Sequence, residues 1–483
     1  MKKHYVLIII SLFSFPLIGL SQNSRDSLTQ LLTLRQCVEF ALRNQPAVRQ
    51  ATIDEDINER DIRISLSAWL PQINSTASYQ RYLQRTTSVA GGTGTGNNGA
   101  GTGNNTGAGS GTGAGNNPGN GAGTNPGTIP STGSQQSVLA LANNVSSIGA
   151  QASQVIYNND VNLASRASKY SRQYYKQNTL STQIDVVSDV SKAFFDVLLS
   201  QRQLEIINED ISRLQRNQKD ALSRYQAGVV DKTDYRQATI ALNNSLASRK
   251  QLQEAVNSRI SYLKQVMGYF PQRPLQLSYD STRYETEAVI DTNQALDVNN
   301  RIEYRLLETQ KSLQNLNVTY YKYGFLPSLS AVGSYNMLYF NEKFSNLYRD
   351  AFPTSFVGLS LNIPIFQGTR RLQNLSKARL QVKRADLDLI NTRNAINTEY
   401  TQALASYKSN YTNWQFLKQN VELAKDVYNV VSLQYREGIK TYLDLIVAQT
   451  DLRTAQLNYY NALFQLLSSK IDLQRSLGTL PVR

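Results

Sequence analysis

The sequence predicts a mainly α-helical protein with a smaller membrane β-barrel portion, and three observations support that class. Of the 27 glycines, 17 lie between Gly91 and Gly133, so the rest of the chain is poor in a residue that interrupts regular structure. No proline occurs between Pro364 and Pro481, which allows very long helices there. Two later segments alternate apolar and small polar side chains over about ten residues, as lipid-facing strands do.

Residues 1–21 have the pattern of a secretory signal peptide. Two lysines precede an apolar stretch from Tyr5 to Leu20, and the small side chain of Ser21 suits cleavage after it. An uncleaved anchor helix is the alternative, although the apolar stretch is short for one. No later segment approaches the roughly 20 apolar residues of a membrane-spanning helix. We therefore expect an exported chain that, if it crosses a membrane, does so without helices.

The composition argues against an enzyme or a metal protein. The only histidine, His4, lies in the leader and the only cysteine is Cys37, which excludes His-based triads, His-ligated zinc and an internal disulfide. We expect no catalytic, cofactor-binding or metal-binding residues. The net charge is +14, but the cations are scattered among acids, which is typical of solvated helix faces and not of nucleic-acid binding.

The chain is predicted to contain two copies of one unit. Residues 225–234 align without gaps with residues 435–444, and both segments begin with Tyr-x-x-Gly. Upstream, Trp69-Leu70-Pro71 matches Phe325-Leu326-Pro327 at a different offset. An insertion in the first copy, the Gly/Asn-rich loop 90–135, explains the change in offset. We predict a first repeat at 22–270, a linker at 271–293 and a second repeat at 294–483.

Each copy is expected to run in the order helix, strand, loop, strand, long helix, tight turn and returning helix. The strands are expected at 73–83, 147–157, 329–339 and 357–365. The helices are expected at 28–68, 160–225, 231–268, 294–324, 367–435 and 441–478, as antiparallel coiled coils with heptad spacing of apolar residues. In the second copy the two shorter helices together match the long one in length. We infer that they stack end to end beside it.

The strand pairs are predicted to cross an outer membrane. In the segment 357–365 every second side chain is large and apolar, and the side chains between them include Gly358, Ser360 and Asn362. An amphipathic hairpin on a soluble core is the alternative. Four strands cannot close a barrel, and an open sheet edge cannot face lipid, so the barrel would be shared between chains. Two chains would give eight strands and three would give twelve, and both assemblies are compatible with this argument.

Taken in order, these features resemble the TolC family of outer-membrane efflux channels. The residues that carry the resemblance are the helix from Leu34 to Pro46, the two Leu-Pro strand entries, the segment 364–368 (Pro-Ile-Phe-Gln-Gly), the two Tyr-x-x-Gly turns and the closing Leu-Gly-Thr-Leu at 477–480. Each signal is weak alone, but together they cover nearly the whole mature chain and occur in order. The first copy departs at 155–159, where the proline and glycine are missing.

The resemblance implies a homotrimer with a twelve-stranded barrel in the outer membrane of a Gram-negative bacterium and a twelve-helix tunnel through the periplasm. Such a protein is the passive exit duct of a tripartite efflux or type I secretion system and carries no cofactor. The implied partners are a periplasmic adaptor (membrane fusion) protein, an inner-membrane pump such as an RND or ABC transporter, and outer-membrane lipid. The adaptor would open the closed periplasmic mouth at the helix tips.

The resemblance also implies a periplasmic gate at the two tight turns. Carried over by position, the gate residues are Thr233, Asp234, Tyr435, Lys440 and Asp444. A tyrosine hydroxyl can donate to a carboxylate and Lys440 can pair with Asp234, and such charge-assisted bonds contribute about 1.5–3 kcal/mol each when shielded. A ring of Asp444 carboxylates would favour cations. Helix capping is the alternative role for both aspartates.

Adaptor docking is implied for the residues around these turns. Gly228 and Gly438 are expected in the left-handed conformation that ends a helix. Lys440 stands where the family example has Arg, which removes bidentate pairing, and Val447 stands where it has a second acid, which should make cation selectivity milder. The remaining docking residues are Arg224, Tyr225, Gln434 and Arg436.

An exported coiled-coil scaffold or adhesin without a pore is the alternative function. A scaffold would not need a lipid-facing band of alternating residues, so the strands distinguish the two classes. A scaffold should also wash off membranes in carbonate or salt, whereas a barrel should not.

Overall fold

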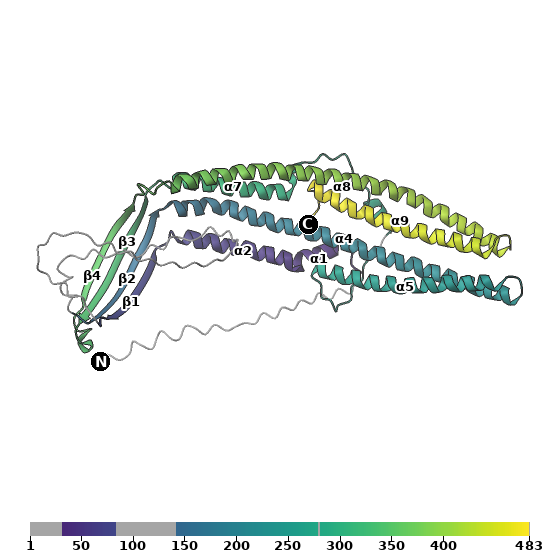
Figure 1. The fold of residues 1–483 in the computed structure, drawn as a ribbon, viewed down its shortest axis with the longest axis horizontal. Helices are drawn as coiled ribbons and strands as arrows, with labels where there is room; N and C mark the ends of the chain where they lie inside the picture. Colours follow the sequence, from purple (N-terminus) through teal and green to yellow (C-terminus); the bar gives the residue numbers. More distant parts are fainter. Residues whose placement is uncertain (1–30, 84–141, 279–280, 483) are drawn as a thin grey trace, which may run out of the picture. The chain divides into compact units, whose positions relative to one another are not determined.

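The computed structural model describes residues 31–83, 142–278 and 281–482 (Figure 1). The expected signal peptide 1–21 and the loop 90–135 lie outside these residues. The chain is mainly helical with a smaller strand portion, so the predicted class is confirmed. The helices and strands are α1 (Leu34–Asn44), α2 (Pro46–Ser67), β1 (Gln72–Arg81), β2 (Asn144–Tyr157), α4 (Asn159–Gln226), α5 (Lys232–Met267), α6 (Ser281–Glu287), η1 (Val298–Asn300), α7 (Ile302–Tyr323), β3 (Ser328–Asn341), η2 (Phe344–Asn346), β4 (Phe352–Asn362), α8 (Arg370–Arg436) and α9 (Tyr442–Leu477).

Contacts divide the chain into two compact units, each discontinuous in sequence. Of the described residues, 31–62, 166–278, 281–319 and 372–482 belong to the helical unit, and 63–83, 142–165 and 320–371 belong to the sheet unit. Both units draw on both predicted repeats. The boundaries at 22–270, 271–293 and 294–483 therefore stay a prediction about sequence duplication, and the short helix α6 lies within the expected linker.

The sheet has the strand order β1-β2-β3-β4, and each neighbouring pair is antiparallel. The register aligns Ile73 with Ala152, Ala152 with Gly333 and Gly333 with Val357, so one row crosses all four strands. β4 begins earlier than expected and ends at Asn362, before Pro364. Proline has no N–H to donate to a neighbouring strand, which explains why the strand ends before the apolar alternation in the sequence does.

The two faces of the sheet differ in polarity, as the alternation predicts. Side chains of one face include Ile73, Ile148, Val357, Leu359 and Leu361, and most of them are exposed in the single chain. The other face is largely amide and hydroxyl, with these residues among it: Gln72, Asn74, Thr76, Ser78, Ser147, Gln151, Ser334, Asn336, Ser360 and Asn362. One face thus suits lipid and the other suits water.

The long helices α4 and α8 have 68 and 67 residues, and α5 and α9 return with 36 residues each. Their ends agree with the predicted ends to within a few residues. α4 packs against α5 and α9 through contacts such as Ser245 Oγ to Asp210 and Gln203 Nε2 to Asn461. Within the described residues, no helix is long and apolar enough to cross a membrane.

Two pairs of short helices meet end to end at glycines, as inferred from the helix lengths. Gly268 ends α5 at φ 67° and a Cβ there would lie 2.8 Å from the Asn44 carbonyl oxygen. Gly478 ends α9 at φ 72° and a Cβ there would lie 2.9 Å from the Asn300 oxygen. Only glycine fits a left-handed residue against a backbone this close.

Each of these two junctions also has a hydrogen bond from a side chain to a backbone carbonyl. Gln45 Nε2 donates to the Gln265 carbonyl (3.5 Å), and Arg301 Nη1 donates to the Arg475 carbonyl (3.2 Å). Each acceptor lies three residues before the glycine. The buried Arg301 also pairs with Glu303 and Glu399, so the second junction is the more strongly bonded one.

Two predicted helices are shorter than expected. The helix 28–68 splits into α1 and α2, because Gln45 precedes Pro46 and takes an extended conformation (ψ 123°). The helix 294–324 starts as α7 only at Ile302. Before it, Asp297 Oδ1 accepts from the Asn299 N–H at 3.0 Å, a local bond that competes with helix formation.

Candidate functional site at the helix turns

The α4–α5 and α8–α9 turns have the same backbone geometry. Gly228 (φ 72°) and Gly438 (φ 75°) are both left-handed. The Val229 N–H donates to the Arg224 carbonyl at 2.9 Å, and the Ile439 N–H donates to the Gln434 carbonyl at 2.8 Å. These bonds satisfy the last carbonyls of each helix. The sequence prediction of a left-handed glycine in each turn is confirmed.

A small apolar cluster joins the two turns. Tyr435 and Tyr442 are buried, with ring centroids 6.1 Å apart in an edge-to-face arrangement. Ala221 of α4, Ala238 of α5 and Leu445 of α9 complete the cluster. The small alanines allow the helices of the first hairpin to approach the tyrosines of the second. The cluster is thus the apolar contact between the hairpins at this end of the helical unit.

The two tyrosine hydroxyls of this cluster are buried and make no hydrogen bond to any residue that the structure describes. Burial raises the pKa of both Tyr435 and Tyr442, and the charge of Asp234 adds to each rise. The Asp234 carboxylate therefore acts on both hydroxyls through its charge and accepts a hydrogen bond from neither. An unpaired buried hydroxyl costs free energy, so these groups are ready to accept a new partner.

Arg224 links the hairpins directly. Its guanidinium carbon lies 4.8 Å from the Tyr435 ring centroid, and its Nη2 donates to the Arg436 carbonyl at 3.4 Å. Its Nε pairs with Asp220 one turn earlier on α4 at 3.1 Å. Arg224 is predicted to face an adaptor, whereas in the single chain it holds the two hairpins together. Tyr225, the sequence counterpart of Tyr435, is exposed.

Asp444 completes a capping box at the start of α9 in the single chain, with Thr441 as the N-cap residue. Its Oδ2 accepts from Thr441 N (3.0 Å) and Thr441 Oγ1 (2.8 Å), while its N–H donates back to Thr441 Oγ1 at 3.2 Å. These bonds form a capping box, and they lower the pKa of the Asp444 carboxyl. Lys440 Nζ lies 3.9 Å from Asp444 Oδ1. The capping alternative thus describes Asp444 in this chain.

The remaining predicted gate residues are Thr233 and Asp234 near the first turn and Lys440 in the second. Asp234 lies in the first turn of α5, and its N–H donates to the Asp231 carbonyl at 3.3 Å. Among the described ion pairs, Lys440 is joined to Asp444 and not to Asp234 as the sequence suggested. Thr233 is exposed. The charge of Asp234 therefore acts on the Tyr435 hydroxyl, although no hydrogen bond joins the two among the described residues.

A buried polar group further along the hairpins is missed by the sequence reasoning. Asp210 of α4 is 1% exposed; its Oδ1 accepts from Gln449 Nε2 at 2.7 Å and its Oδ2 from Arg453 Nη1 at 3.1 Å. Ser245 of α5 donates to the same Oδ2 at 3.2 Å. We name these four residues the Asp210 cluster. A signal was present in the polar Gln449, which lies between Ala448 and Leu452 in the predicted apolar seam.

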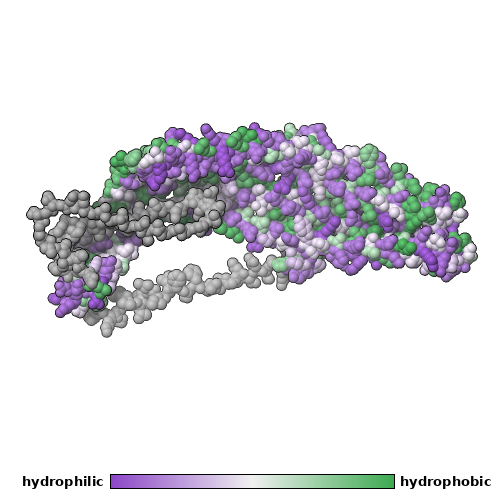
Figure 2. Space-filling view, viewed as in Figure 1, coloured by the Kyte–Doolittle hydropathy of each residue, from purple (hydrophilic) through white to green (hydrophobic). Residues whose placement is uncertain are grey.

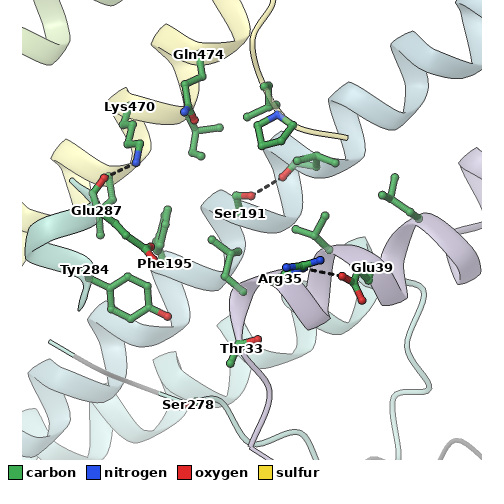
Figure 3. Close-up of a pocket in the computed structure, with 18 residues that line it drawn as sticks. Thr33, Arg35, Glu39, Ser191, Phe195, Ser278, Tyr284, Glu287, Lys470 and Gln474 are labelled. Atoms are coloured by element: carbon green, nitrogen blue, oxygen red, sulfur yellow. Dashed lines mark hydrogen bonds and ion pairs between the residues drawn. The ribbon is translucent and has the colours of Figure 1, made fainter. Parts of the chain in front are cut away.

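A hollow of about 520 Å³ lies between α1, α4, α6 and the C-terminal end of α9 (Figure 3). Its rim carries the Arg35–Glu39 ion pair at 2.9 Å and Lys470, which donates to the Glu287 carbonyl. Burial lowers the pKa of Lys470. The two cations and two acids on the rim balance, so the hollow favours neither anions nor cations. No group of three metal-ligating side chains occurs in the described part of the chain.

Sequence comparison supports the resemblance. A family model described as outer membrane efflux protein matches residues 123–269 and 294–479. The outer membrane protein TolC of Vibrio cholerae is 23% identical over 322 residues, which cover 65% of this chain and 72% of that protein. The TolC of Escherichia coli is 21% identical over 486 residues, which cover 96% of this chain and 86% of that protein.

Solved structures show the same fold. The Campylobacter jejuni CmeC outer membrane channel has a TM-score of 0.68 at 17% identity, over 92% of this chain and 85% of that one. The outer membrane protein VceC from Vibrio cholerae has a TM-score of 0.65 at 14% identity, over 92% of this chain and 96% of that one. The family match covers well over half of the sequence and includes both hairpins with their turns. The chain belongs to the outer membrane efflux protein family.

Proposed function

We propose that the chain is one subunit of a homotrimeric outer-membrane channel, the passive exit duct of a tripartite efflux or type I secretion system. The observation that carries this proposal is the sheet, which has one apolar and one polar face and leaves β1 and β4 as edges in the single chain. Unpaired backbone groups cannot face lipid, so copies of the chain would pair β4 of one with β1 of the next. The barrel would then enclose the polar face.

The long helix α8 supports association between copies. Leu380 and Leu387 are exposed and seven residues apart, and so are Phe416, Leu423 and Val430 in turn. Apolar residues in this spacing form the seam of a coiled coil, and the described part of the chain leaves this seam exposed. A neighbouring copy would cover it. We take three copies from the family resemblance, since the seam itself does not set the number.

We place the gate at the two turns, in the periplasm. The Tyr435–Tyr442 cluster and Arg224 hold the hairpins together, while the unpaired hydroxyls and the nearby Asp234 can exchange partners when the tips move. Exposed apolar side chains gather at this end of the helical unit (Figure 2), among them Val229, Ile439 and Leu443. They suit the docking of a helical hairpin from a periplasmic adaptor, which would receive cargo from an inner-membrane pump.

Single-channel recording in planar bilayers tests the proposal. Wild type would be compared with the double variant Asp234→Ala and Tyr435→Phe, and with Tyr225→Phe as a matched control on the exposed counterpart. We expect small, cation-preferring currents in wild type and in the control, and currents several-fold larger in the double variant. Large currents already in wild type would contradict a gate at the tips. Absence of insertion and current in all three proteins would favour the poreless scaffold.

A further inference from the structure

All four strand–helix connections of the sheet unit lie at one end of the sheet. β1 and β3 begin there and β2 and β4 end there, because neighbouring strands are antiparallel (Figure 1). Large apolar side chains stand exposed at three of these connections, and Ile365 and Phe366 are 93% and 86% exposed. We name the set the junction girdle; it comprises Trp69, Leu70, Phe325, Leu326, Ile365 and Phe366.

Two arginines lie beside this girdle. Arg370 Nη2 and Arg371 Nε both donate to the Gln367 side-chain oxygen, at 2.9 and 3.2 Å. Arg371 also lies over the Phe325 ring, 5.3 Å from its centroid, and its Nη1 reaches the Pro364 carbonyl at 3.5 Å. Neither guanidinium forms an ion pair with a carboxylate of the described residues.

The carboxylate in this neighbourhood is already engaged. Asp160 accepts a hydrogen bond from the Tyr320 hydroxyl at 2.5 Å, and Arg371 lies close enough to influence that hydroxyl. The two guanidinium groups are therefore held in place by neutral acceptors, and among the described residues neither is ion-paired with Asp160. Guanidinium groups match the forked geometry of phosphate oxygens, and aromatic stacking leaves most of their N–H groups available.

The apolar face of the sheet has a hollow of about 520 Å³. Small residues of the central strands, Ala150, Ala152 and Gly333, form part of its lining between Ile73 of β1 and Val357 of β4. The alternation that places Val357, Leu359 and Leu361 on this face continues into Ile363 and Ile365 of the connection. Along the chain, these two apolar residues therefore lie between the strand that borders the hollow and the arginines.

We propose that this end of the sheet binds an anionic glycerophospholipid. Arg370 and Arg371 hold the phosphate, the junction girdle lies at the level of the headgroups, and an acyl chain lies on the apolar face and enters the hollow. The inference rests on the proposed placement of the sheet in the outer membrane with its helices in the periplasm. The lipid would then belong to the periplasmic leaflet, where Trp and other large apolar side chains are favoured at the interface.

Native mass spectrometry of the full chain from defined lipid tests the proposal. The protein would be reconstituted in bilayers of equal phosphatidylglycerol and phosphatidylcholine, and the lipid retained by wild type, R370Q/R371Q and the control R379Q/K383Q would be counted. The control removes two exposed cations further along α8. We expect wild type and the control to retain phosphatidylglycerol in preference to phosphatidylcholine. In R370Q/R371Q the ratio of retained phosphatidylglycerol to retained phosphatidylcholine should be at least ten-fold lower.

Equal retention by wild type and R370Q/R371Q would overturn the proposal. If the double variant does not fold, the single change R370Q serves in its place, at an exposed residue whose one hydrogen-bond partner in the described part of the chain is Gln367. Its preference for phosphatidylglycerol should fall several-fold. Soluble glycerophosphate in excess should not displace the lipid; displacement would show a free-phosphate site without acyl recognition. Current recordings from each protein distinguish failure of the lipid proposal from failure of the channel proposal. If only the lipid proposal is wrong, wild type still conducts; if the channel proposal is wrong, wild type gives no current.

Discussion

The two turns of this chain align residue for residue, yet they are built differently. Each has its glycine in the left-handed conformation and the same pair of backbone bonds. In the first turn, however, Tyr225 is exposed and Asp231 makes no side-chain capping bond. In the second, Tyr435 is buried and Thr441 caps α9. The glycine thus fixes the path of the turn, while the residues around it determine how firmly the turn is held.

The difference teaches which hairpin provides the anchor. The second turn contributes both tyrosines of the buried cluster, whereas the first contributes two alanines and the guanidinium of Arg224. At the position of Tyr442 the first copy has Lys232, which stays in solvent. The second hairpin therefore provides the large apolar side chains of this contact, and the first provides the small residues and the cation that pack against them.

The largest effect is expected where the hairpins share a buried charge. Asp210→Ala leaves Arg453 and Gln449 without the carboxylate that accepts from both, and removing one partner of a buried pair costs about 3–5 kcal/mol. The free energy of unfolding, measured with denaturant on the reconstituted protein, should fall accordingly. Asp451→Ala, at an exposed acid of α9, should change it by no more than about 0.5 kcal/mol. Equal effects would show that the Asp210 cluster does not join the hairpins.

A smaller effect is expected at the position where the two turns differ most. Tyr442→Ala opens a cavity in the cluster and should cost about 3 kcal/mol, whereas Lys232→Ala at the matching position should be nearly neutral. Limited proteolysis tests this difference in stability: the turns of Tyr442→Ala should be cleaved faster than those of Lys232→Ala. Similar cleavage of both would mean that the tyrosine cluster does not hold the second turn.

The smallest effect is a pH dependence of the second turn alone. The folded-state pKa of Asp444 is lowered by its bonds to Thr441, so its capping contribution is present above the unfolded value of about 3.9 and is lost as the pH falls through the lower folded value. Protection of the amides at the start of α9 against hydrogen exchange, relative to the intrinsic rate at each pH, should fall below about pH 4, and Asp444→Asn should remove the dependence. A wild-type exchange profile that matches Asp444→Asn across this range would contradict the cap.

Much of the fold is predictable because it depends on spacing along one element. The strand faces follow from alternation at residues such as Leu359 and Ser360, and the turns follow from Gly228 and Gly438. The end-to-end helices follow from length. The break at Gln45 was readable too, since Pro46 restricts the residue before it. The family match then confirms the resemblance that these local patterns suggested.

Contacts between helices were harder to predict. Each residue turns a helix by about 100°, so small errors in register over a long helix decide which side chains meet. Hence Asp210 was not matched with Gln449 and Arg453, and Lys440 was assigned to Asp234 instead of its own neighbour Asp444. Tyr442 was not among the predicted gate residues, and it is buried in the cluster beside Tyr435. The gate and docking roles of the turn residues stay predictions, since they concern contacts with other chains.

The glycine junctions allow the two helical hairpins to change in length without changing the rest of the chain. Gly268 and Gly478 end α5 and α9 against separate helices, so the segments on either side need not share a helical register. A seven-residue block inserted into α5 and α9, and into the facing parts of α4 and α8, would extend the hairpins by about 10 Å while keeping every apolar face in phase. The sheet, α2 and α7 would be unaffected, which makes hairpin length a separately adjustable dimension of this architecture.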